Sequence, residues 1–402
     1  MIPFSFLRGI YRAYMAILKW VVMMVPAPRP TLYQGVDSSL ELCEAIEQMG
    51  VKRLLVVTDA MLVKIGLLNP VLERLSELGV EHAVFDGVEP DPTIAQIEAG
   101  LEAVKSSDAE AILAIGGGSS IDAAKMIAAR VTHPNKPVRK MDGLFKLRAA
   151  MMPLFVIPTT AGTGSEVTLA AVVSDPDNKR KFAAMDPKLV PDMAALDGKL
   201  MTGLPPHITA ATGMDALTHA VEAYISRNAL PDTDRYGLAA TRLIMENLPK
   251  VMEDGSDIEA RQNMAVASHF AALAFTRAGV GYVHAISHNF GAYYHVPHGL
   301  ANAIVLPHVL AFSKPECTER LARLAEVSGL DGANDDAKAE AFIEHIRELN
   351  RRFDIPAGLD KIRDEDIPGI AKAALKEAHW TYAVPRYMNR GECERFIAGI
   401  KA

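Results

Sequence analysis

The sequence predicts a two-domain protein in which an α/β domain with a parallel sheet is followed by an all-α domain. The 402 residues exceed the length at which a single hydrophobic core usually stops growing. From Arg29 to about Leu200, short β-branched runs alternate with amphipathic stretches, which is typical of parallel strands joined by crossover helices. Beyond Leu204-Pro205-Pro206 the strand pattern stops, and long helical stretches rich in Ala, Leu and Glu continue to the C-terminus. We therefore expect an extension at residues 1–28, an α/β domain at 29–203 and a helical domain at 204–402.

The extension from Met1 to Val25 is apolar and aromatic, and its only charges are Arg8, Arg12 and Lys19. On a helix these three lie within about 40° of one another. A basic stripe on an apolar helix is typical of a helix in a membrane interface, where it would attract anionic lipid. The run is too short for a confident transmembrane span, and Pro26-Ala27-Pro28 would be a poor signal-peptide cleavage region. Packing on the protein body or on a partner subunit is an equal alternative.

Between the extension and residue 203 the alternating pattern predicts individual elements. Each candidate strand is short and rich in β-branched residues, and the stretches between them have helical periodicity. The candidate strands are Leu54–Thr58, Ala83–Asp86, Ile112–Ile115, Leu154–Ile157 and Ala170–Ser174, and the helices include Asp37–Met49 and Thr93–Lys105.

Composition limits the partners and the compartment. The net charge of -7 and the lack of a basic stripe in the domains argue against nucleic acid as a partner. Cys43, Cys317 and Cys393 are far apart and odd in number, so neither a disulfide framework nor a thiolate metal site is expected. A reducing cytoplasm fits this cysteine usage, with a membrane-associated position at its cytoplasmic face if the extension binds lipid.

Two polar loops follow candidate strands. Gly116, Gly117 and Gly118 lead into a helix that Ser119 opens, and such glycines let the backbone approach a pyrophosphate. A purely structural turn is the alternative, because the run is not the standard G-x-G-x-x-G. The second loop, residues 158–166, carries hydroxyls and glycines where open α/β sheets bind ligands.

Asp59 ends the strand Leu54–Thr58. A carboxylate there can accept both hydroxyls of an adenine ribose and would repel a 2′-phosphate, which favours NAD over NADP. The spacing alone fits a helix N-cap equally well.

Histidines crowd into one quarter of the chain and suggest a metal site. Asp215 and His219 are four residues apart, hence on one helical face, and His284 and His288 repeat that spacing. Each pair lies in an apolar stretch, where unpaired polar groups would be unfavourable. We expect Asp215, His219, His284 and His298 to bind a divalent first-row metal. The crowded histidines are His207, His219, His269, His284, His288, His295, His298 and His308.

The spacing gives less reason to expect the remaining histidines of the cluster to be metal ligands. His288 is placed near the substrate as a proton relay. His295 and His308 support the ligands or are purely structural, and the sequence does not rank these two readings.

The sequence resembles the iron-containing, group III alcohol dehydrogenase family from about Pro30 to beyond Pro307. The resemblance is carried by GGGSSIDAAK from Gly116, PTTAGTGSEVT from Pro158, ATGMDALTHAVEAY from Ala211 and HAISHNFGAYYHVPHGLANA from His284. It implies a Rossmann-like domain, a helical domain with dehydroquinate synthase-like architecture, and a cofactor cleft between them. It also implies cofactor contacts, at Asp91 where the family commonly has Asn, and at Asp59, Gly117, Gly118, Ser119, Thr159, Thr160, Thr168, Lys181, Leu200 and Gly203.

The function that follows is a metal-dependent NAD(H) alcohol dehydrogenase acting on small to medium aliphatic alcohols and aldehydes. A divalent metal, Fe(II) by family or Zn(II) as the alternative, acidifies a bound alcohol, and NAD accepts the hydride. The aromatic residues Phe275, Phe290, Tyr293 and Tyr294 suggest an uncharged pocket, although they fit a core as well. We also expect a homo-oligomer.

The alternative function is a lyase resembling 3-dehydroquinate synthase, which uses NAD and a metal too. Its phosphorylated substrate should require clustered Lys and Arg, and residues 284–298 contain neither.

Overall fold

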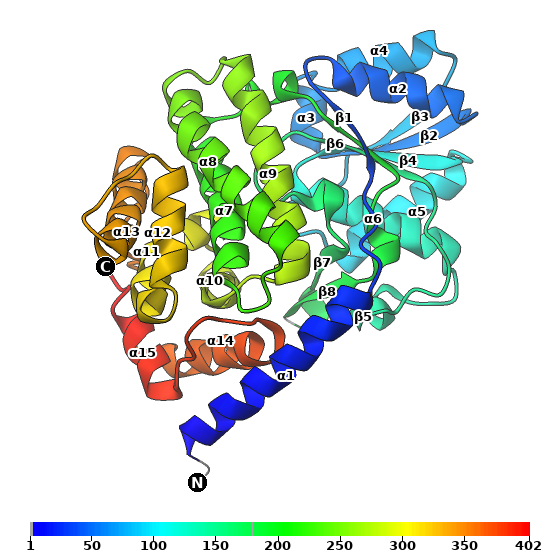
Figure 1. Cartoon of the computed structure of the whole chain (residues 1–402). Helices are drawn as coiled ribbons and strands as arrows, with labels where there is room; N and C mark the ends of the chain where they lie inside the picture. Colours follow the sequence, from blue (N-terminus) through cyan, green and yellow to red (C-terminus); the bar gives the residue numbers. More distant parts are fainter. Residues whose placement is uncertain (1–2, 179) are drawn as a thin grey trace. The chain divides into compact units, whose positions relative to one another are not determined.

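The computed structural model of the chain describes residues 3–178 and 180–402 and divides into two compact units (Figure 1). Pro26–Leu204 and Ser256–His269 form an α/β unit, and the other residues form a helical unit. Helix α9 (Ile258–Ala278) has residues in both units, which the sequence pattern did not indicate. The expected α/β and all-α classes are confirmed, while the expected domain ranges stay a prediction. Met1 and Ile2 of the expected extension lie outside the described residues.

The α/β unit is built on a six-stranded sheet in which every neighbouring pair of strands is parallel. The strand order is β1-β9-β6-β4-β2-β3, so the chain crosses over between strands through helices, as the alternation predicted. The strands are β1 (Thr31–Gln34), β2 (Arg53–Val57), β3 (Glu81–Phe85), β4 (Ala111–Gly116), β6 (Leu154–Pro158) and β9 (Met193–Leu196), and the helices are α2 (Ser38–Gln48), α3 (Ala60–Lys64), α4 (Asn69–Glu77), α5 (Ile94–Ser106) and α6 (Gly118–Thr132).

Both faces of the inner strands β2, β4 and β6 are buried, which explains why these strands are continuously apolar, whereas the edge strands β1 and β3 are partly exposed. In β2, Leu54 and Val56 enter one core cluster while Leu55 and Val57 enter the other. The first cluster includes residues of α2 and α4, and the second includes residues of α5 and α6. The last four side chains of β2 are therefore removed from water, and the strand ends at Val57, two residues before the polar Asp59.

The expected strand Ala170–Ser174 exists as β7 (Ala170–Asp175), but its place in the parallel sheet was wrong. It pairs antiparallel with β8 (Arg180–Met185) in a separate three-stranded sheet that also contains β5 (Gly143–Leu144). Only a short turn at Pro176–Asn178 follows β7, which is too short for a crossover helix.

The helical unit contains no strand among residues 205–402, all of which the structure describes. Its α7 is buried along most of its length, and α8, α11 and α12 pack against it. The helices are α1 (Phe4–Met24), α7 (Pro206–Ile225), α8 (Pro231–Glu253), α10 (Tyr282–Tyr294), α11 (His298–Ser313), α12 (Thr318–Val327), α13 (Asp335–Arg352), α14 (Ile367–Thr381) and α15 (Arg390–Ala398).

The extension forms α1, which packs on the helical unit beside α14 (Figure 1). Tyr11 stacks on Tyr387 with ring centroids 5.7 Å apart and also contacts Trp380 edge-on. The Lys19 ammonium donates to the carbonyl oxygens of Arg227 and Ala229, at 3.2 and 2.9 Å. Of the two alternatives for the basic stripe, Lys19 fits packing on the body, because its charge is used to dock the helix.

The opposite face of α1 carries apolar side chains without a packing partner on the body. Ile17 and Trp20 are each 65% exposed, and no charged residue interrupts this face. Among the described helices, none is long and apolar enough to cross a bilayer. The exposed face consists of Phe6, Ile10, Ile17, Trp20, Val21 and Met24, and Tyr14 at its border contacts Trp380 edge-on.

Candidate metal and nucleotide sites

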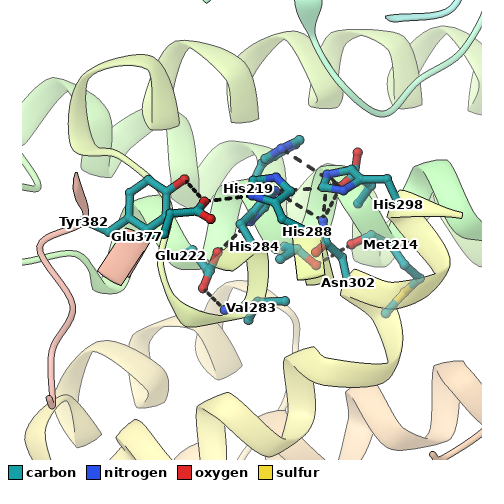
Figure 2. A network of polar contacts seen from close by, with 12 residues as sticks. Met214, His219, Glu222, Val283, His284, His288, His298, Asn302, Glu377 and Tyr382 are labelled. Atoms are coloured by element: carbon teal, nitrogen blue, oxygen red, sulfur yellow. Dashed lines mark hydrogen bonds and ion pairs between the residues drawn. The ribbon is translucent and has the colours of Figure 1, made fainter. Parts of the chain in front are cut away.

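The four expected metal ligands converge within the helical unit, and Figure 2 shows His219, His284 and His298 among them. Asp215 and His219 come from successive turns of α7, His284 from α10 and His298 from the first turn of α11. The Asp215 Oδ1 lies 4.0, 3.9 and 3.6 Å from the Nε2 atoms of His219, His284 and His298. One ligand atom from each residue lies within 4.8 Å of all the others. A carboxylate oxygen and three imidazole nitrogens suit Fe(II) or Zn(II), so the residues present fit a divalent metal.

Close helix packing creates this convergence. A Cβ on Gly299 would lie 2.3 Å from the Ala211 carbonyl oxygen, so only glycine lets the start of α11 approach α7 this closely. A Cβ on Gly213 would similarly meet Leu248 of α8 at 2.5 Å. Glycine therefore brings His298, the residue before Gly299, within reach of Asp215 one turn along α7.

Glu222, which the sequence analysis did not single out, orients His284. Its Oε2 lies 2.7 Å from His284 Nδ1, and its Oε1 accepts a hydrogen bond from the Val283 backbone at 2.8 Å. Burial raises the Glu222 pKa to about 7, while burial and the neighbouring imidazoles hold the His284 pKa well below its usual value. With the His284 proton on Nδ1, Nε2 presents its lone pair to the cluster, which is the form that binds a metal.

Asn302 is the second residue that the sequence analysis missed. It lies one turn after His298 on α11, and its Nδ2 donates to Asp215 Oδ1 at 2.7 Å. The same nitrogen lies 3.2 Å from Nε2 of His284 and 3.2 Å from Nε2 of His298. The helical spacing from His298 was the available signal, as was the spacing of three residues between His219 and Glu222.

His288 lies beside the ligand group without belonging to it. Its ring stacks on that of His298 with centroids 5.3 Å apart, and its side chain is 43% exposed. Its Nδ1 lies 2.8 Å from Oε1 of Glu377, which also accepts a hydrogen bond from the Tyr382 hydroxyl at 2.7 Å (Figure 2). No short sequence spacing relates Glu377 to His288, so this contact comes from the fold alone.

The other histidines are used elsewhere. His295 ends α10 in a left-handed conformation, and His308 Nε2 lies 3.2 Å from the Ala357 carbonyl oxygen. In the α/β unit, His269 Nδ1 lies 3.0 Å from Oε1 of buried Glu166. These contacts favour structural roles for them.

In the α/β unit, the two polar loops meet at the carboxyl ends of adjacent strands β4 and β6. A Cβ on Gly118 would lie 2.7 Å from Thr163, and one on Gly117 would lie 3.4 Å from Thr160 Oγ1. Gly117 is also the N-cap of α6, so backbone amides at the helix start are directed to this edge. The structure thus brings Gly117, Gly118 and Thr160 together.

Three further residues that were expected to contact the cofactor, Asp91, Ser119 and Lys181, also lie next to one another. The Lys181 ammonium lies 2.6 Å from Asp91 Oδ2, and the Asp91 backbone amide donates to Ser119 Oγ at 3.2 Å. Asp91 has a φ of 60°, a left-handed conformation that Asn and Asp tolerate better than most residues. The family's common Asn would therefore fit the same backbone.

Buried charges unnoticed in the sequence hold the second loop. The Lys125 ammonium donates to the carbonyl oxygens of Thr168 and Ala170, each at 2.8 Å, and to Thr168 Oγ1. Asp122 accepts from Ser165 Oγ at 2.5 Å. Burial lowers the Lys125 pKa to about 8 against the opposing effect of Asp122. Expected cofactor residue Thr168 thus also anchors the loop.

The remaining expected residues are placed as follows. Asp59 caps α3, because its Oδ1 accepts from the amides of Met61 and Leu62 at 3.0 Å each. Asp59 therefore caps the helix through Oδ1, and its expected contact with a ribose stays a prediction. Thr159 is buried after β6, and Leu200 and Gly203 lie in and just after the 3₁₀ helix Gly198–Met201.

Comparison with known proteins identifies similarity along nearly the whole chain. Residues 29–198 match the model of iron-containing alcohol dehydrogenases, and residues 209–399 match that of the C-terminal region of the Fe-containing alcohol dehydrogenase family. NAD-dependent methanol dehydrogenase of Bacillus methanolicus is 40% identical over 352 residues, 87% of this chain and 92% of that protein. Lactaldehyde reductase of Escherichia coli K12 is 38% identical over 341 residues, 84% of this chain and 89% of that protein.

Among solved structures, 1,3-propanediol oxidoreductase superposes with a TM-score of 0.90 at 37% identity and covers 94% of this chain and 100% of its own. These similarities favour the dehydrogenase expectation over the lyase alternative.

We expect His284→Ala and His298→Ala to lose bound metal and nearly all activity, because each removes one of four convergent ligands. NADH binding should persist, since the nucleotide loops belong to the other unit. Metal analysis and NADH titration measure both properties. His308→Ala is the matched control and should keep its metal. Full metal occupancy in the two ligand variants would contradict the assignment.

Asp59→Gly should relax the preference for NAD over NADP, because it removes both the diol acceptor and the charge that faces a 2′-phosphate. Glycine at an N-cap lowers stability by only a few tenths of a kcal/mol, so the fold should tolerate the change. The ratio of kcat/KM for the two cofactors is the measurement. An unmoved ratio would leave Asp59 as a helix cap only.

Proposed function

We propose roles for individual residues of this chain, which belongs to the iron-containing alcohol dehydrogenase family. It is an NAD- and metal-dependent oxidoreductase that transfers hydride between an alcohol or aldehyde and the nicotinamide. The observation that carries the assignment of residues is the convergence of Asp215, His219, His284 and His298 on one point of the helical unit.

These four residues would hold the divalent metal, with Fe(II) proposed from the family and Zn(II) as the alternative. When bound, the metal supplies Lewis acidity to the substrate oxygen, and NAD supplies the hydride acceptor. The protein keeps the imidazole ligands neutral and the carboxylate anionic, and it orients them and limits their contact with water. Glu222 does this for His284 by fixing its Nδ1, and the burial of α7 does it for Asp215 and His219.

Gly117, Gly118 and Ser119 would bind the pyrophosphate at the start of α6, and Asp59 would bind the adenine ribose. The expected contacts of Asp91 and Lys181 fit a cofactor because their ion pair borders Ser119. The proposed roles of Thr159, Thr160, Thr168, Leu200 and Gly203 rest on the family resemblance and on their places in the second loop and in the segment that ends the unit.

His288 is the proposed proton relay. It is exposed enough to meet water, it stacks on His298, and Glu377 accepts or shares the proton on its Nδ1. A proton released by the substrate could then pass to His288 Nε2 while Glu377 stabilises the charged ring.

The proposed substrates are small, uncharged aliphatic alcohols and aldehydes. Phe275 stacks on the His219 ring with centroids 4.2 Å apart, so an aromatic surface borders the metal ligands. Phe290 is fully buried and belongs to the core, and the Tyr294 hydroxyl donates to Asp366. Of the aromatic residues expected around the substrate, Phe275 is thus the best placed.

The compartment and the partners complete the proposal. All three cysteines are free and buried, and burial raises the pKa of each thiol to about 12, which fits a cytoplasmic protein with structural thiols. We further propose that α1 touches a membrane through its exposed apolar face, with Trp20 at the level of the lipid headgroups. A homo-oligomer is the competing use of that face.

Purified, metal-loaded protein should reduce NAD with ethanol, butanol and 1,2-propanediol, and oxidise NADH with the matching aldehydes. Absorbance of NADH over a series of increasing chain length measures the preferred size. Chelation should abolish turnover and added metal should restore it. Conversion of a phosphorylated substrate without net change in NADH would instead support the lyase alternative.

His288→Ala should keep its metal and slow turnover by about 10²–10⁴-fold, the usual contribution of a positioned proton donor or acceptor. The pH profile of kcat and metal analysis are the measurements, and His295→Ala at the end of α10 is the control. If turnover were unchanged across the pH range, His288 would have only a packing role.

The membrane proposal predicts that the full chain pellets with vesicles, whereas Ile17→Glu and Trp20→Glu do not. Because Lys19 is bonded to the protein and Arg12 lies 3.6 Å from Glu316, pelleting should depend less on anionic lipid than three free basic residues would make it, with exposed Arg8 supplying the remaining dependence. Met49→Glu, which changes an exposed apolar residue of α2, is the control. Equal pelleting of all variants would refute membrane contact, and concentration-dependent dimers lost in the α1 variants would favour a second copy on this face.

A further inference from the structure

Asn302 occupies an unusual position in the metal site. It is fully buried, and its Nδ2 contacts three of the four candidate ligand atoms at 2.7 to 3.2 Å (Figure 2). Its Oδ1 is buried and has no hydrogen-bond partner among the described residues. A buried amide with one unsatisfied end is unfavourable, and a leucine of the same shape would avoid that penalty. What distinguishes Asn302 is therefore its amide nitrogen, whose contacts are the candidate ligand atoms and not a backbone carbonyl.

The three atoms that face the amide are all hydrogen-bond acceptors or can be. Asp215 Oδ1 belongs to a carboxylate, and Glu222 on Nδ1 leaves Nε2 of His284 with a lone pair. These atoms repel one another when nothing positive lies between them, and burial strengthens the repulsion. Only the nitrogen end of the amide can bond to such a set, which fixes the orientation of the side chain.

We propose that Asn302 is a positioning residue whose amide nitrogen takes the place of the cation in the metal-free protein. It bonds to the ligand atoms and keeps them together, and these bonds are replaced by metal–ligand bonds when the metal binds. The two N–H groups neutralise part of the repulsion between Asp215 and the imidazoles, so the site is assembled before any ion arrives. This inference rests on the proposed metal site, and it concerns the metal-free state of that site.

A thermodynamic cycle separates this role from the two other possible ones. If Asn302 supports the metal-free state, removing it destabilises that state more than the metal-loaded state, and metal affinity must then rise by the difference. If its oxygen were instead a ligand, the loaded state would lose more and affinity would fall. A purely structural asparagine would affect both states equally and leave affinity unchanged.

Asn350 is a matched control. It is a buried asparagine of α13 whose Nδ2 donates to the Ala303 carbonyl oxygen at 2.7 Å, and its Oδ1 is likewise buried without a partner. Asn350→Ala should lower the Tm of both states alike and leave metal affinity unchanged.

The experiment compares Asn302→Ala with the unaltered full chain. Metal is removed by chelation, Tm is measured with and without Zn²⁺, and the Zn²⁺ dissociation constant is measured by competition with a chromogenic chelator, then repeated with Fe²⁺ without oxygen. We expect a larger Tm loss in the metal-free state and a dissociation constant about tenfold lower, as for a lost hydrogen bond to a charged group. Asn302→Leu, which keeps the volume but has no donor, should behave in the same way and replaces the alanine variant if that one does not fold.

Equal Tm losses in both states, or weaker metal binding in the Asn302 variants, would overturn the inference. Failure of the unaltered chain to bind Zn²⁺ or Fe²⁺ would refute the proposed metal site itself, so the two failures are distinguishable.

Discussion

The carboxylate of Asp215 is buried in the helical unit, and three imidazole nitrogens are directed at the same oxygen. A buried anion surrounded by acceptors is unstable unless positive charge or hydrogen-bond donors compensate it. Much of the surrounding structure serves this requirement. α7 is buried on nearly all sides, glycines at 213 and 299 let α8 and α11 approach it, and Glu222 and Asn302 fix the neighbours of the carboxylate.

The α/β unit solves a related problem in another way. There the buried charged groups are Lys125 and Asp122, which bond to Ser165 in the second polar loop and to residues 168–172 that follow it. Both groups have their own partners, so no additional ion is required. These bonds fix the end of the loop to α6 and leave the position of Ser165 defined. The buried charges of the α/β unit are thus compensated by protein groups, whereas the buried ligand set of the helical unit has an arrangement that suits a metal.

Local spacing explains which features the sequence could predict. Four-residue spacing placed Asp215 with His219, and alternating runs predicted β2, β4 and β6, because these relations depend on a few adjacent residues. Asn302 and Glu222 share helical faces with the ligands, but an amide and a lone glutamate in an apolar stretch have no distinctive pattern. The partnership of His288 with Glu377 joins residues 89 positions apart, and the inward direction of Lys19 depends on carbonyl oxygens more than 200 residues away. Only the folded chain brings such residues together. For Asp59, spacing fitted a helix cap and a cofactor contact equally well, and the folded chain shows that Oδ1 caps α3.

The docking of α1 also determines the environment of both tryptophans, and therefore the intrinsic fluorescence of this protein. The chain contains two tryptophans, Trp20 on the exposed face of α1 and Trp380 on α14, where its ring meets Tyr11 and Tyr14. Both indoles are about half exposed or more, so their emission is sensitive to the surrounding solvent. The intrinsic fluorescence of the whole enzyme is thus an optical signal from its N-terminal helix, and a shift in emission wavelength would reveal undocking or burial of that helix without any added label.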